Sequence, residues 1–104
     1  MRKVQIKVIK VTFDEVLAER YLTDGKSAGA CPYFKVGDTF TYNGGAQQPD
    51  GFCPWAWIDI YTNVSTLSYG GTYTPWNNAE GETIVCCTDG IRPVSFELKA
   101  TLEP

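Results

Sequence analysis

The stretch Cys53–Tyr61, CPWAWIDIY, begins the main helical pattern of the chain, which runs on to Tyr69 and stops at Gly70-Gly71. Proline is favoured at the first helical position, where its missing N–H would have no partner, and glycine is favoured just beyond the last turn. We therefore expect a main helix that starts at Pro54, with Cys53 as its N-cap residue.

The apolar side chains of this helix recur at the spacing of a single face. The expected stripe consists of Trp57, Ile60, Tyr61, Val64 and Leu67, widened by Trp55 and Ile58. Three polar side chains are expected to face water, those of Asp59, Asn63 and Thr66. The sequence thus predicts a Trp-rich helix that is largely buried in its first half.

Four other segments have the pattern of β-strands. Residues 3–8 alternate between apolar and polar, and the apolar positions then shift to Ile9 and Val11. This shift predicts either a bulge near Ile9 or burial on both faces. The other three segments are residues 39–42, 82–88 and 92–101. Asp89-Gly90, between the last two, favours the positive φ angles of a hairpin turn.

A short helix is expected after the first strand, where residues 12–15 have the spacing of a capping box. Its apolar stripe would consist of Val16, Leu17 and Tyr21. Together these elements predict a single α+β domain over residues 1–104, with a small antiparallel sheet of about four strands packed on one main Trp-rich helix. The first strand is expected to pair with the last and to close a small, curved sheet.

Composition and charge exclude several classes of partner. Nine Lys and Arg against twelve Asp and Glu leave a net charge of −3, and no segment beyond the first strand concentrates positive charge. We therefore expect no nucleic-acid partner. The first residues, MRKVQIKVIKVTF, interleave lysines with apolar residues, whereas a secretory signal or a membrane span needs an unbroken apolar run. These observations predict a cytoplasmic protein with no membrane partner.

The cysteines are the candidate chemistry of the chain. The candidate metal ligands are Cys31, Cys53, Cys86 and Cys87, of which three would bind. A reducing compartment favours metal or catalytic roles for thiols over structural disulfides. The chain has no C-x-x-C knuckle, and adjacent strand residues point to opposite faces, so only one of Cys86 and Cys87 can join a centre without a bulge. The leading hypothesis is a soft transition metal, zinc, held by three sulfurs with an open position or with Asp89 or Asp50 as an oxygen ligand.

The absence of histidine removes several kinds of site. No His-rich catalytic zinc and no Ser–His or Cys–His nucleophile pair can form. A thiol redox role stays open for Cys53, because the N-terminus of a helix favours the thiolate form. It also stays open that the cysteines pack as small, buried hydrophobes.

A ligand-binding or protein-interaction module with structural cysteines is the alternative to a metal protein. Trp76 lies in a polar loop with Tyr73, where an exposed aromatic side chain could contact a ligand, a partner or a second subunit. Arg92 and Asp89 are further candidate contacts, Arg92 for an anion, although a solvated charge and a turn also explain them. A homodimer through a free sheet edge is a further hypothesis.

Three blocks of sequence stand out, Cys31-Pro32-Tyr33-Phe34 with Gly37-Asp38, Gly51–Trp57, and Cys86–Gly90 with Arg92-Pro93-Val94. Together they resemble a family of small, uncharacterised bacterial and archaeal proteins. The resemblance covers most of the chain, except the loop at residues 43–48. It implies a small prokaryotic domain with a recurring cysteine pattern. The family has no established activity, so the resemblance assigns no catalytic residue.

Overall fold

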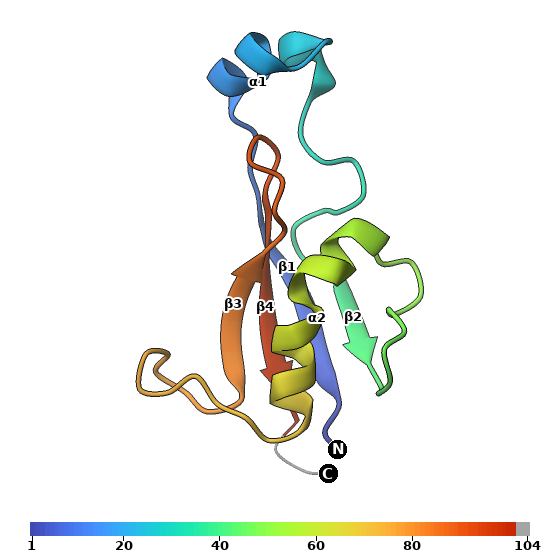
Figure 1. The fold of residues 1–104 in the computed structure, drawn as a ribbon, viewed down its shortest axis with the longest axis vertical. Helices are drawn as coiled ribbons and strands as arrows, with labels where there is room; N and C mark the ends of the chain where they lie inside the picture. Colours follow the sequence, from blue (N-terminus) through green and yellow to red (C-terminus); the bar gives the residue numbers. More distant parts are fainter. Residues whose placement is uncertain (102–104) are drawn as a thin grey trace.

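The structure is a computed structural model that describes residues 1–101. A four-stranded antiparallel sheet forms the centre of the molecule (Figure 1). The strands are β1 (Val4–Val11), β2 (Thr39–Tyr42), β3 (Glu82–Cys86) and β4 (Val94–Ala100), in the spatial order β2-β1-β4-β3. The first strand pairs with the last, as predicted, and the register shifts at a bulge between Val8 and Lys10. The sheet is open, because β2 and β3 are its two edges, so the expected closure is wrong.

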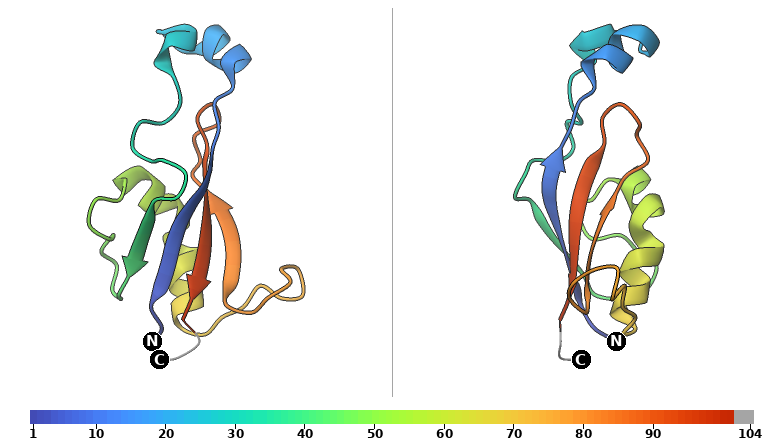
Figure 2. Two further views of the ribbon diagram at one scale, coloured as in Figure 1. Left: turned by 180° about the vertical axis from the view of Figure 1, so that it is seen from behind. Right: turned by 90° about the vertical axis from the view of Figure 1, so that its left-hand side faces the viewer.

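One long helix covers one face of this sheet, which confirms the α+β class (Figure 2). This helix, α2 (Pro54–Ser68), has Cys53 as its N-cap, as predicted. Two short helices, α1 (Glu15–Tyr21) and the 3-10 helix η1 (Gly25–Ala28), lie between β1 and β2 in the chain. Within residues 1–101, no helix is long and apolar enough to cross a membrane.

The hydrophobic core lies between α2 and the sheet face that points toward it. The fully buried side chains of the two central strands are Val4, Ile6, Val8, Val94, Phe96 and Leu98. The helix adds Ile60, Val64 and Leu67, which are also fully buried. Four phenylalanine rings form an aromatic cluster at one end of the core, Phe34, Phe40, Phe52 and Phe96. The alternation of β1 and β4 therefore defines the core, as the sequence predicts.

The buried face of α2 is narrower than predicted. Trp57 and Ile60 are buried, but Trp55 and Ile58 are 69% and 78% exposed. At the spacing of an α-helix, these two residues lie on the side opposite the stripe that faces the sheet. The prediction that Trp55 and Ile58 widen the buried stripe is wrong, because the sheet covers only one side of the helix.

The connection between β3 and β4 is longer than the predicted two-residue turn. β3 ends at Cys86 and β4 begins at Val94, so residues 87–93 form a loop. Gly90 is not among the glycines with a positive φ. Instead, the Asp89 carboxylate accepts hydrogen bonds from the backbone N–H groups of Ile91 and Arg92, at 2.9 and 2.8 Å. Hydrogen bonds to the side chain of Asp89 therefore stabilise this loop, and not the positive φ angles that the Asp89-Gly90 dipeptide predicts.

The helices α1 and η1 belong to an arm, residues 14–30, that projects beyond the end of the sheet (Figure 1). The molecule is elongated as a result, with a longest dimension of 46 Å. α1 begins after Asp14, whose carboxylate accepts a hydrogen bond from the N–H of Leu17 at 2.9 Å. The N-cap is therefore Asp14, and the capping box predicted from Thr12 is wrong.

The apolar side chains of α1 face solvent rather than the core. Val16 and Tyr21 are 78% and 67% exposed, and Ala18 is the buried residue of this helix. The guanidinium of Arg20 lies 4.8 Å from the centre of the Tyr21 ring. The apolar stripe therefore predicts the presence of α1 correctly, but its side chains do not pack against the core.

Candidate functional site

A cavity of about 520 Å³ lies where the N-terminal turn of α2 meets the β3–β4 loop and the segment after η1. Three of the four cysteines line it, Cys31, Cys53 and Cys87. The rest of its wall consists of Tyr33, Phe34, Pro54, Trp55, Ala56, Asp89, Arg92 and Val94. We call this cavity the thiol pocket. The fold thus brings together cysteines from three distant parts of the chain, at the end of α2 where the sequence predicts a site.

Cys31 is held in the wall by the segment that carries it. Phe34, three residues further on, packs its ring 5.1 Å from that of Phe96, measured between ring centres. The N–H of Gly37 donates to the carbonyl oxygen of Val8 at 2.8 Å, which ties the segment to β1. Cys31 is partly buried against the core as a result.

Cys53 contributes its backbone, and not its sulfur, to the start of α2. Its carbonyl oxygen accepts a hydrogen bond from the N–H of Trp57 at 3.0 Å. The side chain makes no capping hydrogen bond, and Pro54 occupies the first helical position without an N–H. The thiol of Cys53 is therefore part of the pocket wall and not a helix cap.

The two adjacent cysteines diverge, as strand geometry predicts. Cys87 is buried, its N–H donates to the carbonyl oxygen of Val94 at 3.1 Å, and its Sγ accepts from the N–H of Val94 at 3.4 Å. Cys86 is exposed and is not part of the pocket wall. Cys87 is therefore the member of the pair that shares the pocket with Cys31 and Cys53.

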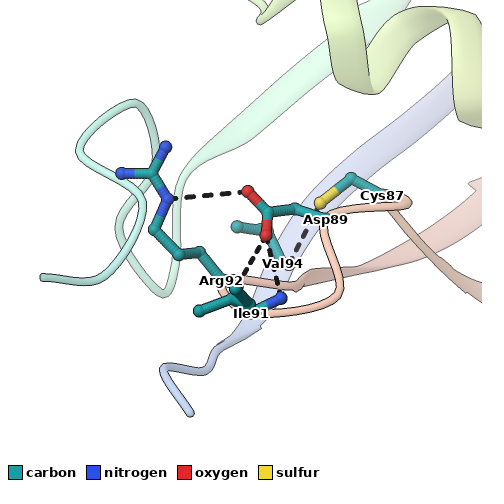
Figure 3. A network of polar contacts seen from close by, with 5 residues as sticks. All are labelled: Cys87, Asp89, Ile91, Arg92 and Val94. Carbon is teal, nitrogen blue, oxygen red and sulfur yellow. Dashed lines mark hydrogen bonds and ion pairs between the residues drawn. The ribbon is translucent and has the colours of Figure 1, made fainter. Parts of the chain in front are cut away.

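Asp89 and Arg92 supply the charged part of the pocket wall, and they contact each other within a small network of polar contacts (Figure 3). The Oδ2 atom of Asp89 lies 3.5 Å from Nε of Arg92. Burial alone would raise the pKa of the Asp89 carboxyl, but hydrogen bonds from the backbone N–H groups of Arg92 and Ile91 and the charge of Arg92 outweigh it. The pKa of Asp89 therefore lies below its ordinary value. The two outer nitrogens of Arg92 point away from this carboxylate in Figure 3.

Asp59 joins the two walls of the thiol pocket. Its Oδ2 atom accepts hydrogen bonds from the backbone N–H of Thr88 at 2.8 Å and from the Thr88 hydroxyl at 3.0 Å. This contact connects the second turn of α2 to the β3–β4 loop. The sequence predicts that Asp59 simply faces water, whereas the structure gives its carboxylate a structural role.

The remaining predicted site residues lie elsewhere. Trp76 is 83% exposed in the loop after α2, and Asp50 lines a different cavity beside β2. Within residues 1–101, no three side chains of cysteine, aspartate or glutamate converge closely enough to hold a metal ion. The thiol pocket therefore gathers three of the predicted metal ligands without forming a preassembled metal cluster.

Sequence reasoning overlooked two aromatic residues of the pocket, Tyr33 and Trp55. Tyr33 is 68% exposed, and Trp55 follows Pro54 at the start of α2. The sequence assigns Trp55 to the core, but its position on the helix opposite Ile60 and Val64 could have placed it outside. No comparable pattern marks Tyr33, because it lies in a segment without regular structure.

No protein-family model, curated protein or solved structure matches this chain. The resemblance of its three cysteine blocks to a family of small prokaryotic proteins therefore stays a prediction. The geometry of the thiol pocket is the basis for a functional assignment.

Proposed function

We propose that the protein binds a small, mainly apolar molecule with an anionic group in the thiol pocket. The observation that carries this proposal is the size and lining of the pocket. Its volume of about 520 Å³ falls within the range of small-molecule sites, about 300–1,000 Å³. Such sites combine an apolar wall with a few placed polar groups, and this pocket has one arginine and one aspartate among apolar and thiol side chains.

The three thiols suit the apolar body of such a ligand. A free cysteine packs as a small, polarizable hydrophobe, and sulfur makes favourable contacts with aromatic rings. All four cysteines are free thiols, a state that the predicted cytoplasmic location would preserve. Together with Phe34, Tyr33 and Trp55, the thiols offer a lining for an aromatic or short aliphatic group.

Arg92 is the partner we assign to the anionic group. Its contact with Asp89 uses Nε, and an arginine side chain carries four further N–H donors on its outer nitrogens. The backbone of the same loop is fixed by the Asp89 carboxylate, so Arg92 starts from an ordered position. A preorganised arginine of this kind favours an anion that offers two oxygens to its outer N–H groups, such as a carboxylate or a sulfonate.

Anilinonaphthalene sulfonate is a suitable probe, because it joins an aromatic body to an anionic group. We expect saturable binding, with NMR shifts concentrated on the backbone amides of Cys31, Cys87 and Val94. Arg92→Gln should weaken this binding by about tenfold, the effect of one lost hydrogen bond to a charged group.

A matched pair of cysteine variants tests whether the pocket is the site. Cys31→Phe places a ring inside the pocket and should abolish binding, whereas Cys86→Phe adds the same ring outside it and should leave the affinity unchanged. Equal binding by the two variants, each shown to be folded by its NMR spectrum, would contradict the proposal.

Zinc binding is a second candidate, favoured by the convergence of Cys31, Cys53 and Cys87 on one cavity. A three-sulfur zinc site needs Zn–S distances near 2.3 Å, so the three thiols would have to move together on binding. Elemental analysis of protein purified without an affinity tag should then show about one zinc per chain. Loss of that zinc in Cys87→Ser but not in Cys86→Ser would assign the ligand, and zinc-free protein would reject this candidate.

That Cys53 is a reactive thiolate stays a prediction, based on its position at the N-terminus of α2. The test is the rate of alkylation of Cys53 as a function of pH, with the exposed Cys86 as the internal control. If Cys53 reacts with the same pH dependence as Cys86, a redox role loses its basis.

A further inference from the structure

A second cavity, of about 470 Å³, lies between the loop after α2 and the sheet face that points away from α2. The loop contributes Trp76, Asn77 and Asn78, and the strands contribute Glu82, Ile84 and Glu97. We call this cavity the acidic cleft. We propose that it binds the ammonium group of a small organic cation. The residues of the cleft are distinct from those of the thiol pocket, so this inference does not rest on the function proposed there.

Trp76 offers the cleft an aromatic face. Its side chain is 83% exposed, and within residues 1–101 no other aromatic ring packs against it. A tryptophan face attracts a cation more strongly than the other aromatic rings do, because its π-electrons concentrate negative charge there. Ile84, itself 59% exposed, provides an apolar surface beside it for the carbon chain of a ligand.

The charge of the cleft is negative, and one of its two carboxylates is free to pair with a ligand. Glu82 lies 2.9 Å from Nζ of Lys99, a contact that raises the pKa of that lysine, with a smaller contribution from Glu97. Glu97 itself makes no ion pair in the part of the chain that the structure describes. Lys7 is its neighbour across the sheet but does not line the cleft. Glu97 is therefore the carboxylate we assign to the ammonium group.

An unpaired acceptor adds an independent argument for a hydrogen-bond donor in this cleft. The Oδ1 atom of Asn77 is buried and has no hydrogen-bond partner among the described residues. A buried acceptor without a partner is costly, and few occur in a native structure. The backbone of Asn77 is held by its N–H, which donates to the carbonyl oxygen of Tyr73 at 2.8 Å. A ligand N–H that reaches Oδ1 would supply the missing partner.

These groups select a cation over an anion or a neutral molecule. The cleft offers carboxylates, an amide oxygen and an aromatic face, and no lysine or arginine lines it. An alkylammonium group carries three N–H donors and a positive charge on a short apolar chain, so it matches each of these surfaces. The concave shape and the volume of about 470 Å³ fit a small molecule.

Butylammonium is the probe for this site, with n-butanol and butyrate as the uncharged and oppositely charged controls of the same chain length. We expect saturable NMR shifts of the Trp76 indole N–H and of the Asn77 and Ile84 amides with butylammonium alone. Added salt should weaken the binding, because it screens an exposed charge. Equal shifts with n-butanol, or no saturable shift with butylammonium, would overturn the proposal.

Two pairs of matched variants locate the binding groups. Trp76→Ala should weaken butylammonium binding by about two- to fivefold, the loss expected for an exposed cation–π contact, and Trp55→Ala should not change it. Glu97→Gln should weaken it by a similar factor of about two to five, and Glu80→Gln, outside the cleft, should not. Unchanged affinity in Glu97→Gln would overturn the assignment of an ammonium site.

Discussion

α2 and α1 both carry an apolar stripe at helical spacing, but only the stripe of α2 has a sheet beneath it. In the body of the molecule, formed by the sheet and α2, the stripe residues Ile60 and Val64 are fully buried. In the arm, residues 14–30, Val16 and Tyr21 remain mostly exposed. The same periodicity thus accompanies burial in one region and exposure in the other.

The comparison shows that two properties of a helix are separate: which side chains share a face, and whether that face is buried. Periodicity states which side chains share a face, and this follows from the geometry of the helix alone. Whether the face is buried depends on another element lying against it. α2 runs along the sheet, whereas the chain that follows β1 leaves the end of the sheet before α1 begins (Figure 1). The short α1 instead relies on local contacts, above all the Asp14 cap.

The largest expected effect tests the contrast between body and arm directly. Phe96→Ala removes a fully buried ring and should lower the free energy of unfolding by about 3–5 kcal/mol. Val16→Ala in the arm should change it by no more than about 0.5 kcal/mol, because this side chain is already in water. Urea unfolding followed by tryptophan fluorescence measures both. A cost above about 1 kcal/mol for Val16→Ala would mean that the arm packs against a surface in solution.

A smaller effect is expected in the pH dependence of the free energy of unfolding, and it concerns the β3–β4 loop that lines the thiol pocket. Because the pKa of Asp89 is lower in the folded than in the unfolded chain, its stabilising contribution is complete above the unfolded pKa of about 3.9. The contribution is lost as the pH falls below that value and through the lower folded pKa. We expect about 1 kcal/mol at most, since the pair with Arg92 is more than a third exposed on the aspartate side.

Asp89→Asn is the variant for this measurement. It keeps an oxygen for the N–H groups of Ile91 and Arg92 but does not titrate, so the difference in stability from the unsubstituted protein should shrink as the pH falls below about 4. Asp50→Asn, at an exposed position outside the thiol pocket, is the control. A difference that stays constant with pH would show that the charge of Asp89 contributes nothing.

The smallest effect on global stability is expected from the cap of the arm. Asp14→Ala removes the hydrogen bond to the N–H of Leu17, and a lost N-cap costs a helix about 0.5–2 kcal/mol. Because α1 adds little to the core, the loss should appear as faster hydrogen exchange in α1, with the global free energy of unfolding changed by no more than about 0.5 kcal/mol. Asp24→Ala is the control, since Asp24 precedes η1 without a side-chain cap. Faster hydrogen exchange throughout the chain, with a global loss of more than about 1 kcal/mol, would contradict this account.

The fold was largely predictable from the sequence, because its main elements have strong local patterns. Alternation identifies β1 and β4, and Pro54 identifies the start of α2. The errors fall where a tertiary partner decides the outcome. The pattern places Trp55 in the core because periodicity cannot state how wide a face the sheet covers. The turn at Asp89-Gly90 differs in type and not in place, because the Asp89 side chain stabilises a longer loop in which Gly90 has no positive φ.

The candidate site was predictable only in outline. The divergence of Cys86 and Cys87 follows from strand geometry, but the sequence could not state which of the two lines the pocket. That choice depends on which face of β3 receives α2. The acidic cleft was not predictable beyond Trp76, because Asn77 and Glu97 meet only after the loop folds against the sheet.

The sequence by itself determined the class of the fold, the strand segments β1 and β4, the N-cap of α2 and the opposite directions of the two adjacent thiols. These features depend on local backbone geometry and on the period of apolar residues. The tertiary structure alone decided that Cys31, Cys53 and Cys87 share a pocket with Arg92, and that α1 carries its apolar stripe into solvent. Both outcomes depend on contacts between segments far apart in the chain, which no local pattern encodes.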